Sequence, residues 1–470
     1  MKVTLIGAGS REFGPPTVND LVLSEPLGGH DLTVALMDLD ETALVATHAY
    51  ARQVTASRGS SVRFTSTPVL EEALEGADFV VTAIEGRRYY YWSQDFHIPR
   101  MLGFEQIYGE NGGPGGLFHA LRNMGPLMDI VRTMERVCPD AWMLNYTNPL
   151  TKLCEAQCRL STVRTVGLCH GVFEGMAQVA TFLQRPVDTL SFQSVGLNHF
   201  TWFTRIRDRE TGADLYPQLR ERERRAHWLH DFDEIALSRL LLRSFGLYPS
   251  PGTNHIGEYI RWAGDLLPSQ DMQFFHDPAE GDPWETESIP PWIYNLRDKP
   301  TETPLFHPPR EGRLKPSPNR SADPKDPRPS GELAIPLIEG LVGVARHDLD
   351  AVNVPNRAAT ASSEGESDTS RPFVDGLPLD SVVEVPASVG DGRLEPAAAD
   401  PLPEPVLALL RTQCSINKLL IDAFAEKSRD RLLQALLLDP STHSYGNAVR
   451  LIDMMFERQG DVLPPLVWER

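Results

Sequence analysis

The chain has 470 residues and is acidic, with 64 aspartates and glutamates against 45 lysines and arginines and a formal net charge of −19. No stretch concentrates enough lysine and arginine to neutralise a phosphate backbone, so we expect no nucleic-acid partner. The sequence contains no run of about 18 apolar residues, which is the length needed to cross a membrane. The five cysteines form no disulfide-like framework, so we expect a cytoplasmic protein with reduced thiols.

Short apolar segments alternate with helical stretches along the first 200 residues. Such alternation predicts a parallel sheet covered by helices on both faces. The expected strands cover residues 2–6, 32–37, 62–67, 78–84, 141–144 and 165–168, and the expected helices cover 41–58, 71–75, 117–137 and 172–183.

The pattern changes in the second half. Residues 277–330 are rich in proline, aspartate and arginine and predict long surface loops, and the polar stretch 357–373 predicts a solvated insertion. Helical spacing returns over 405–456. We therefore expect a Rossmann-like α/β domain over residues 1–200 and an α+β substrate-binding domain over residues 201–470.

A glycine turn, Gly7-Ala8-Gly9-Ser10, follows the first expected strand, and Asp38 ends the second. Glycines let the backbone approach a pyrophosphate, and a carboxylate at the second strand's end binds the ribose of NAD. The third glycine of the usual pattern is missing, since position 12 is Glu12 and Gly14 comes two residues later. We predict an NAD site, with a tight turn and no cofactor as the alternative.

Two apolar runs end in side chains that bind metals or move protons. One ends at Cys169-His170 and the other at Asn198-His199. A thiolate can ligate a metal, and a histidine can ligate or transfer a proton. The spacing is not that of a zinc finger. A buried inert thiol and histidines satisfied in the core are the alternative interpretation.

Together these motifs resemble glycoside hydrolase family 4, the NAD-dependent and divalent-metal-dependent glycosidases. The resemblance implies a lactate/malate dehydrogenase-like fold, manganese as the usual metal, a small-molecule glycoside as substrate, and a homodimer or homotetramer. The motifs that carry it are Gly7-Ala-Gly9-Ser10, Met37-Asp38-Leu-Asp40, Asn111-Gly-Gly-Pro-Gly-Gly116, Asn145-Tyr-Thr-Asn148-Pro149, Gly167-Leu-Cys169-His170, Gly196-Leu-Asn198-His199, Ser330-Gly-Glu332, Val352-Asn353-Val-Pro-Asn356 and Val382-Val-Glu384-Val-Pro386.

The family's mechanism is an exception to the two-carboxylate rule of glycosidases. It implies oxidation of the sugar at C3, removal of the C2 proton, elimination of the leaving group, addition of water at C1 and return of the hydride. The resemblance assigns the metal to Cys169 and His199, and His170, next to the metal ligand, is the candidate acid for the leaving oxygen. Asn148 is expected to hold sugar hydroxyls, with Asn145 as a second-choice contact.

The base is expected in the segment from Phe245 to Tyr259. His255 falls at or near the position of the family's tyrosine, while Tyr248 and Tyr259 remain alternatives. An imidazole suits the task because its ordinary pKa lies near neutral pH. His255 could also serve only to bind substrate.

His170 after the metal-binding cysteine resembles the branch that acts on unphosphorylated α-glycosides. That branch includes α-galactosidases, α-glucosidases and α-hexuronidases. Asn254 stands where the hexuronidase pattern has an arginine. Arg87, Arg88 or Arg122 could bind a sugar carboxylate or form surface ion pairs instead.

Two other functions are compatible with parts of the pattern. A simple NAD-dependent dehydrogenase of the lactate/malate type would share the fold but has no use for a thiolate beside His199. A catalytically inactive sugar-binding protein would explain the incomplete glycine pattern. The joint presence of Cys169, His170, His199 and Asn148 favours an active enzyme.

Overall fold

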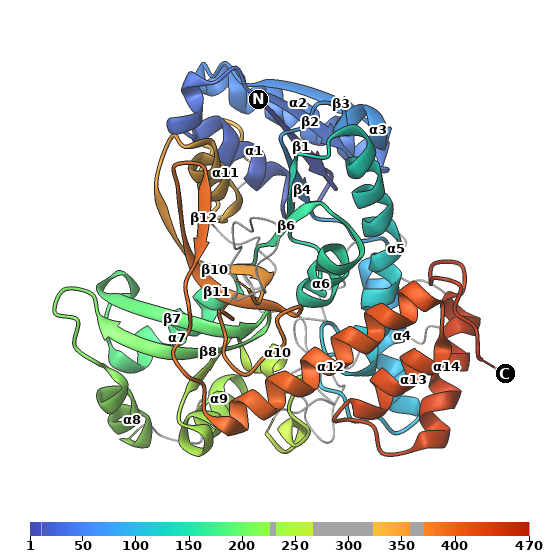
Figure 1. The fold of residues 1–470 in the computed structure, drawn as a ribbon. Coiled ribbons are helices and arrows are strands. Elements are labelled where there is room, and N and C mark those ends of the chain that lie inside the picture. Colours follow the sequence, from blue (N-terminus) through green and yellow to red (C-terminus); the bar gives the residue numbers. More distant parts are fainter. Residues whose placement is uncertain (11, 226–231, 267–322, 358–370, 470) are drawn as a thin grey trace, which may run out of the picture.

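The computed structural model describes residues 1–10, 12–225, 232–266, 323–357 and 371–469. They form a twelve-stranded sheet with helices on its faces (Figure 1). The strands are β1 Lys2–Ile6, β2 Thr33–Met37, β3 Arg63–Thr67, β4 Phe79–Thr82, β5 Trp142–Asn145, β6 Arg164–Gly167, β7 Leu190–Leu197, β8 Phe200–Asp208, β9 Tyr248–Ser250, β10 His347–Pro355, β11 Val382–Gly390 and β12 Arg393–Pro396. The helices are α1 Gly14–Leu23, α2 Glu41–Arg58, α3 Leu70–Leu74, α4 Arg88–Met101, α5 Gly113–Val137, α6 Leu150–Leu160, α7 Gly171–Leu183, α8 Tyr216–Arg225, α9 Phe232–Phe245, α10 Thr253–Gly257, α11 Ala334–Val342, α12 Glu404–Glu426, α13 Arg429–Leu438 and α14 Tyr445–Gln459.

The first six strands are parallel, in the order β3-β2-β1-β4-β5-β6. This is the strand order of a Rossmann fold, so the predicted fold class is confirmed. Alternate residues of these strands point into hydrophobic clusters on opposite faces of the sheet. Val3 and Leu5 of β1 point into the cluster that includes α1 and α2, whereas Ile6 joins the cluster that includes α3 and α5. Burial on both faces explains why these strands are apolar throughout.

The sheet continues past β6 without a break. β10 pairs antiparallel with β6, β11 pairs with β10 and β7, and β8 and β9 complete the edge. This arrangement places the turn between β7 and β8 beside the end of β6. Because the sheet is continuous, the division at residue 200 remains a prediction. Most of the expected loops 277–330 and insertion 357–373 lie outside the described residues.

The helical stretch predicted over 405–456 forms three helices, α12, α13 and α14. Lys427 adopts a left-handed conformation at the end of α12, and Ser428 and Ser444 cap the next two helices. These helices pack beside α4, α5 and α6, although they belong to the expected second domain (Figure 1). The chain therefore ends by covering the first half of its own sheet.

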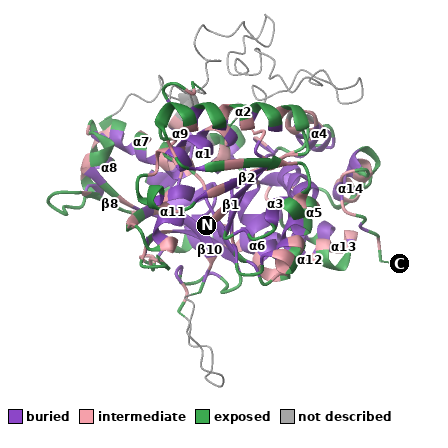
Figure 2. Ribbon diagram, turned by 90° about the horizontal axis from the view of Figure 1, so that it is seen from above, coloured by how far each residue is buried: buried purple, intermediate pink, exposed green. Residues whose placement is uncertain are grey.

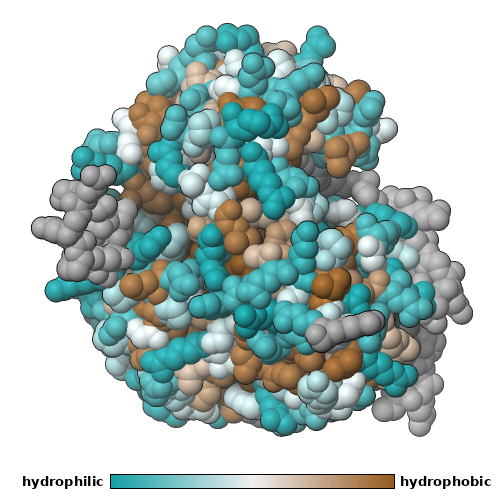
Figure 3. Space-filling view, turned by 45° about the vertical axis from the view of Figure 1, so that its right-hand side comes forward, coloured by the Kyte–Doolittle hydropathy of each residue, from teal (hydrophilic) through white to brown (hydrophobic). Residues whose placement is uncertain are grey.

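Burial and surface polarity follow this layered plan. Figure 2 shows buried residues along the strands and the inner helix faces, while the outer face of α2 is exposed. On the face drawn in Figure 3, hydrophobic and hydrophilic residues alternate in small patches. Among the described residues, no helix is long and apolar enough to cross a membrane.

Gly14 allows the close helix packing that the third glycine provides in the usual dinucleotide-binding pattern. It opens α1, and a Cβ there would lie 2.1 Å from the carbonyl oxygen of Ala8. Gly7 has a φ of 82°, and its Cβ would lie 2.1 Å from the carbonyl oxygen of Ala83. Both positions therefore require glycine, one for helix packing and one for the turn.

Gly14→Ala is expected to destabilise the protein, because the added methyl group would overlap the Ala8 carbonyl. Overpacking of this kind costs about 1–3 kcal/mol, and the midpoint of thermal unfolding should fall. Gly28→Ala is the matched control, since Gly28 has no atom within 4 Å of an added Cβ. Equal midpoints for the two variants would contradict the close approach of α1 to the glycine turn.

Candidate active site

The structure brings Cys169 and His199 together. Cys169 lies between β6 and α7, at the carboxyl edge of the parallel strands, where such sheets bind ligands. His199 lies in the turn between β7 and β8 with a φ of 62°, a conformation that residues other than glycine rarely adopt. Its Nε2 lies 3.3 Å from Cys169 Sγ. Sulfur and nitrogen ligands of one ion are separated by ~3.1–3.6 Å at ordinary bond lengths, so the pair fits a shared metal.

Cys169 and His199 are the candidate ligands for this metal. Among the described residues, no group of three or more histidine, cysteine, aspartate or glutamate side chains could hold an ion. A hard divalent cation takes up to six ligands, so the other positions would fall to substrate oxygens and water. Because a thiolate is a soft ligand for such an ion, we expect modest affinity.

Burial affects the protonation of both candidate ligands. It raises the pKa of the Cys169 thiol to about 12, and the charge of Glu384 adds to the rise, while hydrogen bonds from Asn198 and the Gly171 N–H lower it. Burial also holds the pKa of His199 well below its usual value. A neutral imidazole is ready to ligate, whereas the thiol must lose its proton as the metal binds.

A buried carboxylate fixes the turn that carries His199. Glu384 of β11 accepts hydrogen bonds from the side-chain amides of Asn198, at 2.7 Å, and of Asn353 in β10, at 2.9 Å. The backbone N–H of Asn198 donates to Thr151 Oγ1 at 2.9 Å. Three family-like motifs therefore meet at one carboxylate behind the candidate metal pair.

His170 caps the start of α7 beside Cys169 and is 45% exposed at its side chain. Its Nδ1 lies 2.9 Å from Glu332 Oε1. The hydrogen bond to Glu332 is the largest cause of the raised pKa of His170, and it outweighs burial. The residue therefore suits proton donation near neutral pH.

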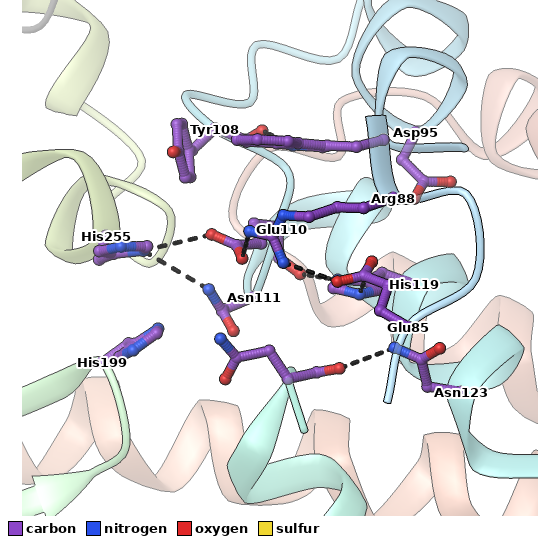
Figure 4. Close-up of polar contacts among 12 residues, drawn as sticks. Glu85, Arg88, Asp95, Tyr108, Glu110, Asn111, His119, Asn123, His199 and His255 are labelled. Carbon is purple, nitrogen blue, oxygen red and sulfur yellow. Dashed lines mark hydrogen bonds and ion pairs between the residues drawn. The ribbon is translucent and has the colours of Figure 1, made fainter. Parts of the chain in front are cut away.

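His255 lies over His199, with ring centroids 4.3 Å apart (Figure 4). Its Nδ1 is 3.2 Å from Glu258 Oε1 and 4.0 Å from Glu110 Oε2. Burial lowers the pKa of His255, but the hydrogen bond to Glu258 and the charge of Glu110 give a net rise. Of the three expected base candidates, the structure places this imidazole beside the metal pair.

The two tyrosine alternatives lie in the core. Tyr248 is fully buried in β9 and donates to Gln178 Oε1 at 2.9 Å. Tyr259 is 5% exposed and stacks on Phe200 at 4.6 Å between centroids. Burial raises the pKa of both phenols. Both phenols are packed in the core, so His255 remains the favoured candidate for the base.

Two residues without a predicted role hold the loop over the site. Glu258 Oε2 accepts three backbone N–H groups, from Glu110, Asn111 and Gly112, at 2.7 to 2.9 Å. Lys152 is buried and donates to the carbonyl oxygen of Asn111 at 2.6 Å. Their partners are between 41 and 148 residues away in sequence, so spacing alone could not reveal them.

A charged cluster lies beyond this loop (Figure 4). Arg88 bridges Glu85 and Glu110, and His119 Nε2 lies 2.9 Å from Glu85 Oε1. Burial raises the pKa of Glu85, but Arg88 and His119 bring it well below its usual value. The Arg88 guanidinium thus balances two carboxylates.

The two expected asparagines differ in position. Asn148 precedes a cis peptide bond to Pro149, and its side-chain Oδ1 is buried with no hydrogen-bond partner in the described part of the chain. It remains available to a sugar hydroxyl. Asn145 is fully buried, and its amide is used within the fold by Thr82 and Thr147.

Arg122 has a structural place. Its guanidinium makes a two-point contact with Asp95 Oδ1 and Oδ2, at 3.2 and 2.7 Å, and donates to Gln459 Oε1 at 2.8 Å. The side chain is 5% exposed. The expected contact between Arg122 and a substrate carboxylate is therefore replaced by a buried ion pair that joins α4, α5 and the end of α14.

The nucleotide end has the geometry of a dinucleotide turn. Gly9 N donates to Asp38 Oδ2 at 2.7 Å, which brings the carboxylate at the end of β2 against the turn. Ser10 Oγ accepts from Phe13 N at 3.3 Å, just before α1. The turn, the carboxylate and the start of α1 fit the pyrophosphate and ribose of NAD.

Comparisons with known proteins agree with this arrangement. Over 97% of its length the chain is 29% identical to an alpha-glucosidase from Erwinia rhapontici, 98% of which is covered. Over 98% it is 28% identical to an alpha-galactosidase from Bacillus subtilis, 99% of which is covered. A solved 6-phospho-alpha-glucosidase from gut microorganisms, in complex with NAD and Mn²⁺, shares the fold with a TM-score of 0.71 at 23% identity over 99% of both chains.

A family model described as family 4 glycosyl hydrolase matches residues 2–185. The model of that family's C-terminal domain matches residues 194–442. Together the two matches span both halves of the continuous sheet and the candidate site between them. The chain therefore belongs to family 4 of the glycosyl hydrolases.

Proposed function

We propose that this enzyme is an NAD- and Mn²⁺-dependent glycosidase that cleaves unphosphorylated α-glycosides by oxidation, elimination and re-reduction of the sugar. The observation that carries the proposal is the 3.3 Å approach of Cys169 Sγ to His199 Nε2, with the imidazoles of His170 and His255 beside the pair. The α-glucosidase and α-galactosidase relatives support the choice of α-linked sugars.

When bound, NAD would accept and return the C3 hydride, and the divalent ion would stabilise the negative charge that develops at C2 and C3 of the sugar. Gly7, Gly9, Ser10 and Asp38 would hold the nucleotide. Cys169 and His199 would hold the metal.

The chain supplies the proton transfers. A ketone at C3 acidifies the proton on C2, and His255 is the proposed base for that proton, held by Glu258 at Nδ1. His170 is the proposed acid for the leaving oxygen at C1. Asn148 would accept a hydroxyl hydrogen of the sugar through its unpartnered Oδ1.

Two of the arginines considered for a sugar carboxylate are paired within the protein. Arg122 is paired with Asp95, and Arg88 lies between Glu85 and Glu110. Asn254 is exposed and adds no positive charge. Glucosides and galactosides are therefore the first substrates to assay, with hexuronides beside them.

Hydrolysis of p-nitrophenyl α-glucoside, α-galactoside, α-glucuronide and α-galacturonide tests the proposal. Cleavage should require NAD⁺, Mn²⁺ and a thiol reductant, and NADH should not accumulate because the hydride returns to the sugar. Each component would be omitted in turn. Hydrolysis indifferent to NAD⁺ would refute the mechanism, and net NADH formation would indicate a dehydrogenase.

Cys169→Ala is expected to weaken Mn²⁺ binding and to lower Mn²⁺-dependent hydrolysis at least about 100-fold, because one of two protein ligands is lost. Titration calorimetry with Mn²⁺ measures the first effect independently of turnover. Cys138→Ala at the end of α5 is the control and should change neither quantity. Unchanged Mn²⁺ affinity in Cys169→Ala would contradict the assigned ligand.

Hydrolysis in D₂O should leave deuterium at C2 of the released sugar. The C2 proton passes to His255, exchanges with solvent and is replaced from solvent before the hydride returns to C3. Proton NMR of the product detects the loss of the C2 signal. Direct displacement by water would leave C2 fully protonated, which is the outcome that contradicts the proposed base chemistry.

A further inference from the structure

We propose that Glu332 is a positioning residue for His170, and that helix α1 holds Glu332 in place through Asp20 and Ser330. This inference rests on the proposed function, in which His170 protonates the leaving oxygen. It adds a link between that acid and the helix that follows the glycine turn of the nucleotide end.

The contact with His170 sets the direction of the ring. Glu332 Oε1 lies 2.9 Å from His170 Nδ1, and the carboxylate is 10% exposed while the imidazole is 45% exposed. A half-exposed histidine otherwise samples several rotamers. A carboxylate at Nδ1 fixes the ring and leaves Nε2 to act on the substrate, as in other oriented imidazoles.

Glu332 is itself tied to α1 through Ser330. Glu332 N donates to Ser330 Oγ at 2.9 Å, and Ser330 N donates to Asp20 Oδ1 at 2.7 Å. Ser330 Oγ also donates to Asp20 Oδ2. Gly331, between Ser330 and Glu332, has a φ of 80°. This left-handed conformation lets the chain turn so that Ser330 reaches Asp20 and Glu332 reaches His170.

The segment is also held on either side of this link. Asn19 of α1 donates its amide to the Arg328 carbonyl at 3.3 Å, and Tyr146 accepts from Ala334 N at 3.0 Å. Helix α11, which follows Glu332, contacts α1 (Figure 1). The position of Glu332 is therefore set by α1 and by the loop after β5.

The test compares methyl and p-nitrophenyl α-glucosides and α-galactosides with Glu332→Gln. Methanol is a poor leaving group and needs an acid, whereas p-nitrophenolate leaves without one. We expect kcat/KM for the methyl glycoside to fall by about 10–100-fold, and by much less for the p-nitrophenyl glycoside. A purely structural role would slow both equally.

Glu339→Gln is the matched control. Glu339 lies on α11, accepts from Ser24, just after α1, at 2.5 Å and faces His347 at 2.6 Å. Like Glu332, it therefore contacts a histidine, but away from His170. Glu339→Gln should leave the ratio of kcat/KM for the methyl glycoside to kcat/KM for the p-nitrophenyl glycoside unchanged. Ser330→Ala should shift the ratio in the same direction as Glu332→Gln but less, and an unshifted ratio would overturn the link to α1.

NMR of the protein without cofactors gives a second measurement. A protected His170 Nδ1–H proton is expected in the wild type and in Glu339→Gln, and its loss is expected in Glu332→Gln. Equal slowing of both glycosides by Glu332→Gln, with that proton retained, would overturn the positioning role. If the wild type cleaves none of the α-glucosides, α-galactosides and α-hexuronides with NAD⁺ and Mn²⁺, the proposed function fails, and the acid role of His170 fails with it.

Discussion

The buried carboxylate of Glu384 is the contact on which the site depends. It lies on β11, between β10 and β7 in the continuous sheet, and accepts amide donors from Asn198 and Asn353. Without these bonds a buried carboxylate would be costly, so β10, β11 and the β7–β8 turn are compelled to meet there. That meeting brings His199, in its left-handed conformation, within 3.3 Å of Cys169 at the end of β6.

A second buried carboxylate, Glu258, orders the backbone on the other side of the site. Glu258 gathers three backbone N–H groups of the loop 110–112 with one oxygen and faces the His255 imidazole with the other. If the loop moved away from α10, the buried carboxylate of Glu258 would lose these three hydrogen bonds. One glutamate thus holds both the ring of His255 and the backbone of the loop 110–112.

Local signals predicted the regular elements that have clear boundaries. The bounds of β1 and α2 agree with the sequence prediction, since Asp40 caps α2 at its start and Gly59 ends it in a left-handed conformation. Helix α4 was not predicted, because its aromatic and charged residues lack helical periodicity and it contains Pro99. Motif recognition placed Cys169, His170, His199 and His255 in one site. Glu258, Lys152 and Glu332 act through partners 41 to 162 residues away, which only the tertiary fold reveals.

The way these glutamates are satisfied affects the electrostatics of the site. Glu384 is bound by two neutral amides, and Glu258 Oε2 by three peptide N–H groups. Neutral donors stabilise a carboxylate without cancelling its charge, whereas an ion pair largely cancels it. Arg88, by contrast, forms ion pairs with Glu85 and Glu110. Burial raises the pKa of Glu384. Burial alone would lower the pKa of His255, but the hydrogen bond to Glu258 contributes to a net rise. The two glutamates therefore act differently: Glu384 orders the turn that carries His199, whereas Glu258 affects the protonation of His255.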